Sequence, residues 1–315
     1  MYGQIFHKIV AMREWRHLAL AATLLCGVAG QAHSQQAQPQ SERLVYNIMV
    51  GGLHLGDAMI GLNQTENSYA TEMRMNARGM AKWVRNFSSD MRGEGQLLQA
   101  ATNPTTLDTR PALYSRQWST GEVAADMTMK YDANGKAEVE ERYFNPETSE
   151  PIAHEDLPWN KDDSPSERQR KPVPDAMRTN VLDPMAAFIA ARGQLMAQGL
   201  AAKGPKRFRV PIYDGRRRYD IVGRAEAPRT TEIAGTERSV ITVIAKLEPV
   251  FGFSRKSQVR MEESEGKFLF SNDNRFIPLQ LVVSNDLLSG VMNLTADCSM
   301  DATPCDTFGQ EKDGN

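Results

Sequence analysis

Residues 267–296 read KFLFSNDNRFIPLQLVVSNDLLSGVMNLTA, and this stretch decides the fold class. Apolar side chains occupy every second position from Ile277 to Val283, which places them on one face of a β-strand. The alternation returns from Met292 to Ala296 after a polar turn. The stretch therefore predicts antiparallel strands with one face against a core.

The same period-two spacing recurs in most of the preceding chain. It predicts strands over Leu44–Val50, Leu53–Leu62, Tyr69–Met75, Arg110–Ser119, Ala124–Tyr131, Lys136–Phe144, Phe208–Ile212, Arg217–Ala225, Ser239–Leu247 and Phe251–Met261. Asn134-Gly135 and Asp214-Gly215 are typical of the turns in β-hairpins. About a dozen short strands at this spacing predict an antiparallel β fold.

One helix interrupts the strands. Asp183 is a suitable N-cap, Pro184 suits the first helical position and Gly199 suits the C-terminal end. Phe188 lies in an apolar stripe between these ends, so we expect the helix to pack against the sheet. The predicted fold is mainly β: a strongly curved antiparallel sheet, or a partly open barrel or sandwich, packing on one principal helix.

The first 34 residues have the pattern of a secretory signal peptide: basic residues precede the apolar run 18–29, and small residues surround Ser34. Cleavage is expected after Ser34, and the apolar run is shorter than the about 20 residues of a membrane-spanning helix. A lipid anchor would need Cys26, but Leu25 stands where a small residue is required. The sequence predicts a periplasmic protein without a transmembrane segment.

The mature chain divides into four parts. Residues 35–42 are predicted to form a disordered leader, residues 43–297 a single β-rich domain and residues 298–315 a C-terminal tail. Residues 145–180 contain six prolines and no periodicity, which predicts a long loop within the domain. A solvated loop and a lid over a cavity are both open interpretations of it.

Charge and cysteine content restrict the partners. The full chain carries a formal charge of −2, and residues 1–34 contribute +2 to it, so the mature chain would carry −4. This mildly acidic balance argues against a nucleic-acid partner. Cys298 and Cys305 are the two cysteines outside the signal peptide, and an oxidising compartment favours a disulfide between them over a metal pair.

Four segments together resemble the DUF3108 family of uncharacterised exported bacterial proteins. They are LVYNIMVGGLHLGDAMIGL (44–62), NVLDPMAAFIAARGQL (180–195), VPIYDGRRRYDI (210–221) and FSNDNRFIPLQLVV (270–283). The resemblance implies a β-rich periplasmic domain with one central helix. It implies no known reaction and supplies no functional residues.

Two methionine pairs are the candidate ligand-binding residues. Met73 and Met75 share one strand face, as do Met127 and Met129. Thioethers can bind Cu(I), but no Cys or His accompanies them, so a metal site is not expected. Flexible Met side chains fill core gaps or line an adaptable apolar pocket, and both interpretations remain open. No cofactor is expected.

The sequence shows no catalytic signature, and the protein is expected not to be an enzyme. His54 and His154 are the two histidines outside the signal peptide, and each is interpreted as a structural or solvated residue. Arg216, Arg217 and Arg218 are expected at a solvated hairpin tip, although they could contact anionic headgroups.

Three functions remain open. The first is a non-enzymatic protein that binds a lipid-like or other apolar ligand between sheet and helix. The second is an envelope assembly factor that engages a partner protein through sheet edges or the loop 145–180. The third is a hydrolase, which would need a cleft that brings His54 or His154 near a carboxylate.

Overall fold

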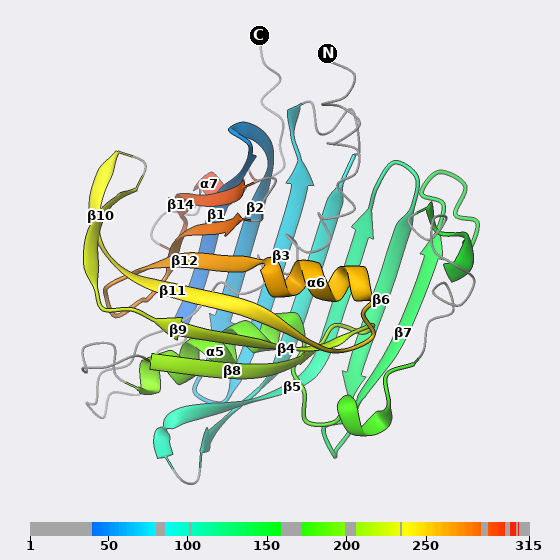
Figure 1. The fold of residues 1–315 in the computed structure, drawn as a ribbon, viewed down its shortest axis with the longest axis horizontal. Coiled ribbons are helices and arrows are strands. Elements are labelled where there is room, and N and C mark those ends of the chain that lie inside the picture. The colour runs from blue at the N-terminus through cyan, green and yellow to red at the C-terminus, as the bar shows by residue number, and fades with distance from the viewer. Residues whose placement is uncertain are drawn as a thin grey trace.

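The computed structural model describes residues 40–79, 86–100, 103–158, 172–198, 206–233, 235–284, 289–299, 303–306 and 308. Within these residues, fourteen strands form one antiparallel sheet (Figure 1). The strands are β1 (Gln40–Val50), β2 (Leu53–Gln64), β3 (Ser68–Ala77), β4 (Ser88–Ala100), β5 (Asn103–Ser119), β6 (Ala124–Tyr131), β7 (Ala137–Phe144), β8 (Lys206–Tyr213), β9 (Arg218–Ala225), β10 (Arg229–Ile233), β11 (Thr236–Phe251), β12 (Glu265–Ser271), β13 (Pro278–Ser284) and β14 (Ser289–Asp297). The prediction of a mainly β protein is confirmed.

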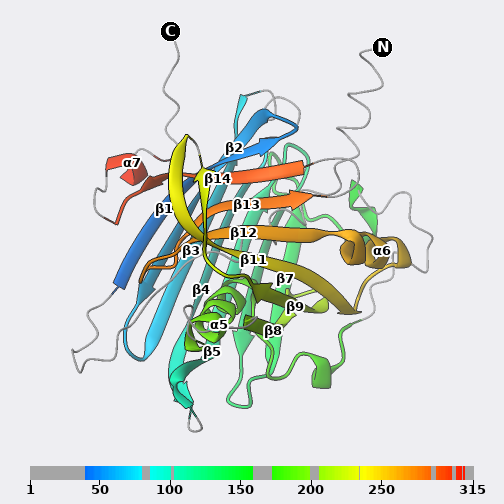
Figure 2. The same cartoon turned by 60° about the vertical axis from the view of Figure 1, so that its left-hand side comes forward.

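The sheet curls into a nearly closed, barrel-like body. Its strand order is β7-β6-β5-β4-β3-β2-β1-β14-β13-β12-β11-β9-β8, with β10 paired to β11. Strands β8, β9 and β11–β13 cross in front of β1–β7 (Figures 1 and 2). A short link joins the two edge strands, because Ala137 N donates to Arg178 O and Leu182 N donates to Pro211 O, each at 2.9 Å.

Helix α5 (Pro184–Ala197) lies between these layers and packs against β4, β5 and β8. Asp183 caps it as predicted: the side chain accepts hydrogen bonds from Met185 N at 2.8 Å and Ala186 N at 2.9 Å. Gly93 on β4 makes room for the helix entrance, because a Cβ there would lie 2.9 Å from Met185 Cβ. The described residues of α5 are mostly buried, so the hollow of the sheet is filled by the protein itself.

Several sequence predictions differ from the structure. The predicted strand Phe251–Met261 is wrong, because helix α6 (Arg255–Glu263) begins after Ser254, whose side chain accepts from Ser257 N. Strands β4 and β10 were not predicted. Strand β1 begins at Gln40, so residues 40–42 belong to the sheet and not to a disordered leader. Most of that leader and the whole signal-peptide segment lie outside the described residues.

The predicted hairpins are confirmed. The β6–β7 turn contains Gly135 at φ 75°, and the β8–β9 turn contains Gly215 at φ 88°. Only glycine adopts such values without strain.

The predicted loop 145–180 is tied to the sheet at both ends. Pro151 forms a β-bridge with Phe144 of β7, and Thr179 forms one with Lys136 in the turn before β7. Single 3₁₀ turns occupy His154–Asp156 and Asp175–Met177, and residues 159–171 lie outside the described part.

The C-terminal segment returns to the outside of the sheet. A disulfide joins Cys298 and Cys305, whose Cα atoms lie 6.1 Å apart, and the short helix α7 (Thr303–Asp306) contacts β1. Both cysteines pack with Met59 of β2 on the face opposite to the main core. These contacts attach the predicted tail to the domain.

Candidate functional site

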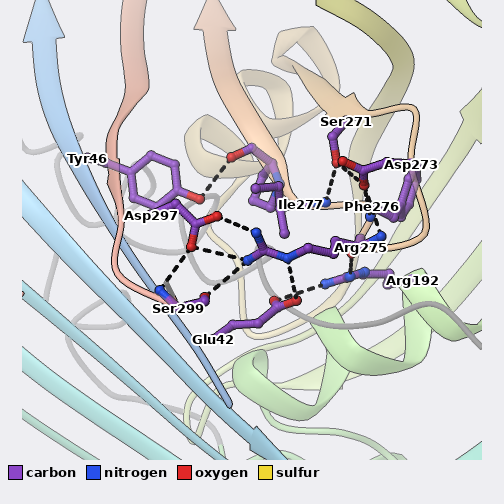
Figure 3. A network of polar contacts seen from close by, with 11 residues as sticks. Glu42, Tyr46, Arg192, Ser271, Asp273, Arg275, Phe276, Ile277, Asp297 and Ser299 are labelled. Atoms are coloured by element: carbon purple, nitrogen blue, oxygen red, sulfur yellow. Dashed lines mark hydrogen bonds and ion pairs between the residues drawn. The ribbon is translucent and has the colours of Figure 1, made fainter. Parts of the chain in front are cut away.

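A buried ion network ties four parts of the fold together (Figure 3). Glu42 of β1 lies between Arg192 of α5, with 3.8 Å between Oε2 and Nη1, and Arg275 of the β12–β13 turn, with 4.0 Å between Oε1 and Nε. Arg275 also pairs with Asp297 of β14. Glu42 and Arg192 are 1% and 2% exposed, so this network belongs to the interior.

Two arginines and two carboxylates balance one another in this network. The hydrogen bond from Arg275 to Asp297 raises the pKa of Arg275. Burial acts to raise the pKa of Asp297, but hydrogen bonds from Arg275 and Ser299 outweigh it and hold this pKa below its usual value. Arg275 and Asp297 are thus both charged at neutral pH and paired with each other, which suits a structural role.

The β12–β13 turn that carries Arg275 is held by its own polar groups. Asp273 Oδ1 accepts from Arg275 N at 2.9 Å and from Phe276 N at 3.0 Å. Phe276 adopts φ 45°, which is unusual for a bulky side chain, and it is fully buried against Phe270, with 4.3 Å between ring centroids. Burial of this ring offsets the cost of the strained backbone, so the packing of Phe276 holds the turn in this conformation.

A second interior cluster lies at the tip of the β8–β9 hairpin. Arg216 Nε donates to Glu141 Oε1 at 2.9 Å and to Oε2 at 3.0 Å, and Arg116 Nη2 lies 3.8 Å from Oε1. The expectation of a solvated arginine tip is therefore wrong for Arg216, because the hairpin inserts against β6 and β7: a Cβ on Gly215 would lie 2.3 Å from Met127 Sδ. Burial and the charge of Arg217 lower the pKa of Arg216 to about 9, which still leaves it charged at neutral pH.

Two hollows lie on the face of strands β1–β7 that points away from the core and from α5. We call these two hollows together the outer groove. The first has a volume of about 480 Å³ and is lined by Arg43, Gly61, Ala70, Glu72, Arg74, Arg92, Glu94 and Ser115, among others. Gly61 lies on its floor beneath Glu72, because a Cβ there would lie 2.7 Å from Glu72 Cγ.

The second hollow has a volume of about 580 Å³ and shares Arg92 and Ser115 with the first. Ion pairs stiffen its wall: Arg92 Nε lies 3.1 Å from Asp90 Oδ1, and Arg142 Nη2 lies 2.6 Å from Asp126 Oδ2. The outward side chains of the groove carry charges of both signs. Such a surface suits a polar or charged partner better than an apolar one.

The structure places the four predicted methionines inside. Met73, Met75, Met127 and Met129 are between 0% and 4% exposed and belong to one core cluster, which also contains Met91 and Met185. Met73 faces Met91 across β3 and β4. The structure brings the four methionines together, but their neighbours are other core side chains of the protein.

Neither His54 nor His154 lines either hollow. His54 Nε2 lies 2.8 Å from Asp57 Oδ1, and Arg78 Nε lies 2.8 Å from the other oxygen of that carboxylate. His154 packs edge-on against Tyr143.

Within the described residues, no group of three or more His, Cys, Asp or Glu side chains could hold a metal ion. No helix in that part of the chain is long and apolar enough to span a membrane.

The fold and its surface define a barrel-like β protein whose interior is closed by its own helix and hairpin. The chain belongs to DUF3108, a protein family of unknown function, which it matches over residues 45–295. No curated protein matches it.

Two solved structures match this chain at low sequence identity. The first is a β-barrel-like DUF1849 protein from Brucella abortus, with 12% identity and a TM-score of 0.45 over 82% of this chain and 96% of that one. The second is a DUF1329 family protein from Desulfovibrio piger ATCC 29098, with 9% identity and a TM-score of 0.21 over 89% and 90%.

Proposed function

We propose that this is an exported, non-enzymatic protein of the cell envelope that binds another envelope protein through the outer groove. The observation that carries the proposal is the position of the two hollows, which lie outside the sheet while α5 and the β8–β9 hairpin fill its inside. The polar groups of the interior clusters are paired with each other, so they suit structural roles.

The charged side chains of the outer groove indicate what kind of partner surface it would bind. Three arginines and two glutamates face outward in the first hollow, and three carboxylates and two arginines do so in the second. A partner segment with charges of both signs complements this surface. Such complementarity affects association rate and specificity, so binding should weaken as salt rises.

Site-specific photocrosslinking in cells tests this proposal. A photoreactive residue at Ala70, on the groove floor, should give one defined crosslinked product. The variant Gly61→Leu should abolish it, because the new side chain fills the hollow and the atoms nearest to its Cβ belong to the flexible side chain of Glu72. A photoreactive residue at Arg224 on β9 is the matched control. Equal products at both positions, or none at Ala70, would contradict groove binding.

A lipid-like or other apolar ligand in the interior is the second candidate. The methionine-rich face of β3–β6 favours it, because Met side chains repack readily around a guest. Native mass spectrometry of protein purified from its own envelope should then show a bound apolar molecule. Retention of that molecule in a Met73→Leu, Met127→Leu variant at wild-type level would count against these residues as the binding site.

Export is supported by the N-terminal pattern and by the disulfide at the C-terminal end. Cell fractionation should place the protein in the periplasm, and its intact mass should correspond to a chain that begins at Gln35. A full-length mass in the cytoplasmic fraction would contradict export.

A further inference from the structure

Three buried polar oxygens lie beneath the entrance of α5. Asp183 is fully buried, and its Oδ1 caps the helix, whereas Oδ2 has no hydrogen-bond partner among the described residues. The hydroxyl oxygens of Tyr69 and Tyr131 are likewise buried without a partner in that part of the chain.

Geometry brings these groups to one region. Gly93 and Gly95 face inward from β4, two residues apart. A Cβ on Gly93 would lie 3.4 Å from Asp183 Oδ1, and a Cβ on Gly95 would lie 2.7 Å from the Tyr69 hydroxyl. Tyr69 pairs with Gly95 and Gly95 with Pro111, and Tyr131 lies one residue beyond Lys130, which pairs with Leu113 two residues further along β5. Tyr131 packs against the core cluster that contains Tyr69 and Met185. In agreement with this placement, burial and after it the charge of Asp183 raise the pKa of both tyrosines.

We propose that ordered water occupies a site bounded by Asp183 Oδ2 and the hydroxyls of Tyr69 and Tyr131. Folded proteins rarely leave buried polar groups without a partner. A water molecule donates and accepts, and buried waters make about three hydrogen bonds, which is the number offered here. Calcium prefers about six or more oxygen ligands, so three side-chain oxygens suit water better.

The site gives Asp183 two tasks. One oxygen caps the helix directly, and the other holds the water that links it to β3 and β6. The entrance of α5 is thus fastened to the inner face of the sheet through water as well as through side-chain packing.

The sign of a stability change tests the proposal. Tyr69→Phe and Tyr131→Phe should each lower Tm by about 2 °C if their hydroxyls bind water. Tyr46→Phe calibrates the effect, because its hydroxyl donates directly to Pro278 O at 2.9 Å. A rise in Tm for both variants would overturn the proposal, because removal of an unpaired buried hydroxyl stabilises.

Two further measurements separate water from other occupants. A crystal structure at high resolution should show a density peak within about 3 Å of Asp183 Oδ2 and of one tyrosine oxygen. Exchange of NaCl for KCl or NH₄Cl at equal ionic strength should leave Tm unchanged. The assignment would be overturned if the crystal structure showed no density peak between Asp183 Oδ2 and the tyrosine oxygens, or if one cation raised Tm above the others.

Discussion

Asp183 combines helix capping with complete burial, and these two features have opposite effects on its charge. Burial is the larger and raises its pKa to about 7, while hydrogen bonds from Ala186 N and Met185 N act to lower it. The carboxyl therefore titrates near neutral pH inside the core.

This shift predicts a pH dependence of stability. Between about pH 4 and pH 7 the folded state holds a proton on Asp183 that the unfolded state has lost, so the free energy of unfolding should fall as pH rises. The expected loss is roughly 2–4 kcal/mol. Urea unfolding at pH 4.5 and 7.5 measures it, and Asp183→Asn, which retains a capping oxygen, should show a much smaller loss. An equal loss in both proteins would refute this role of Asp183.

Glu141 and Arg216 form an asymmetric pair, because Glu141 also lies near Arg116. Glu141→Gln would leave two buried arginines without their counter-charge and should cost about 3 kcal/mol or more. Arg216→Met leaves Glu141 with Arg116 and should cost less. Chemical denaturation compares them, with the exposed Arg142→Met as a control that should change stability by no more than about 0.5 kcal/mol. An equal cost for all three would show that Glu141 does not hold the hairpin.

At the scale of elements, α5 protects the edge of β8. Gln198 Nε2 donates to Arg207 O at 2.7 Å, and Gln198 Oε1 accepts from Arg207 N at 3.0 Å. Gln194 makes the same pair of contacts with Arg209, each at 3.4 Å. The two amides replace the backbone of a neighbouring strand, and Leu182 continues the row along β8.

Removing both amides should expose this edge. Gln194→Ala, Gln198→Ala should associate in a concentration-dependent way, because unpaired edge groups bind other strands. Light scattering at increasing protein concentration measures this, and Gln117→Ala, an exposed position on β5, is the control. A doubly substituted protein that stays as monodisperse as the control would show that the edge is protected by something else.

The packing of α5 against β4 depends on the absence of a side chain at Gly93. Gly93→Val should lower Tm by several degrees, because its side chain would overlap Met185 and Thr71. Gly193→Ala, within α5, meets nothing within 4 Å and should stabilise by about 0.5 kcal/mol. Thermal unfolding of both variants checks the pair, and an unchanged Tm for Gly93→Val would mean that the helix can shift away.

At the scale of the whole molecule, the strands that alternate clearly were predictable because inward and outward positions are a local property of the sequence. Helix α6 was not, since only Met261 anchors it among its described side chains and its apolar positions are few. The interior charges were missed for a different reason. Arg216 and Glu141 are 75 residues apart, and only the closure of the barrel brings them together.

The outer groove could not be predicted either. Its residues alternate outward on seven neighbouring strands, and each strand alone looks like an ordinary solvated face. The hollow arises because Gly61, Ala70 and Ser115 are small where larger neighbours surround them. That coincidence depends on strand register, which the local pattern does not specify.

The last strand should be essential for the whole sheet. β14 lies between β1 and β13, so a chain that ends at residue 288 leaves one edge of each of these two central strands without a partner and should not reach the native state. A chain that ends at Ser299 keeps β14 but loses Cys305, and should fold with a loss of about 2 kcal/mol. Limited proteolysis and circular dichroism compare the two. A protease-resistant shorter chain would disprove the requirement.

The pairing of β1 with β14 also limits when the sheet can close during synthesis. Among the strands of the sheet, β1 is synthesised first and β2 follows directly, yet the second neighbour of β1, strand β14, arrives only when translation has passed residue 289. Until then one edge of β1 has no partner, so the barrel-like sheet cannot close before synthesis is nearly complete.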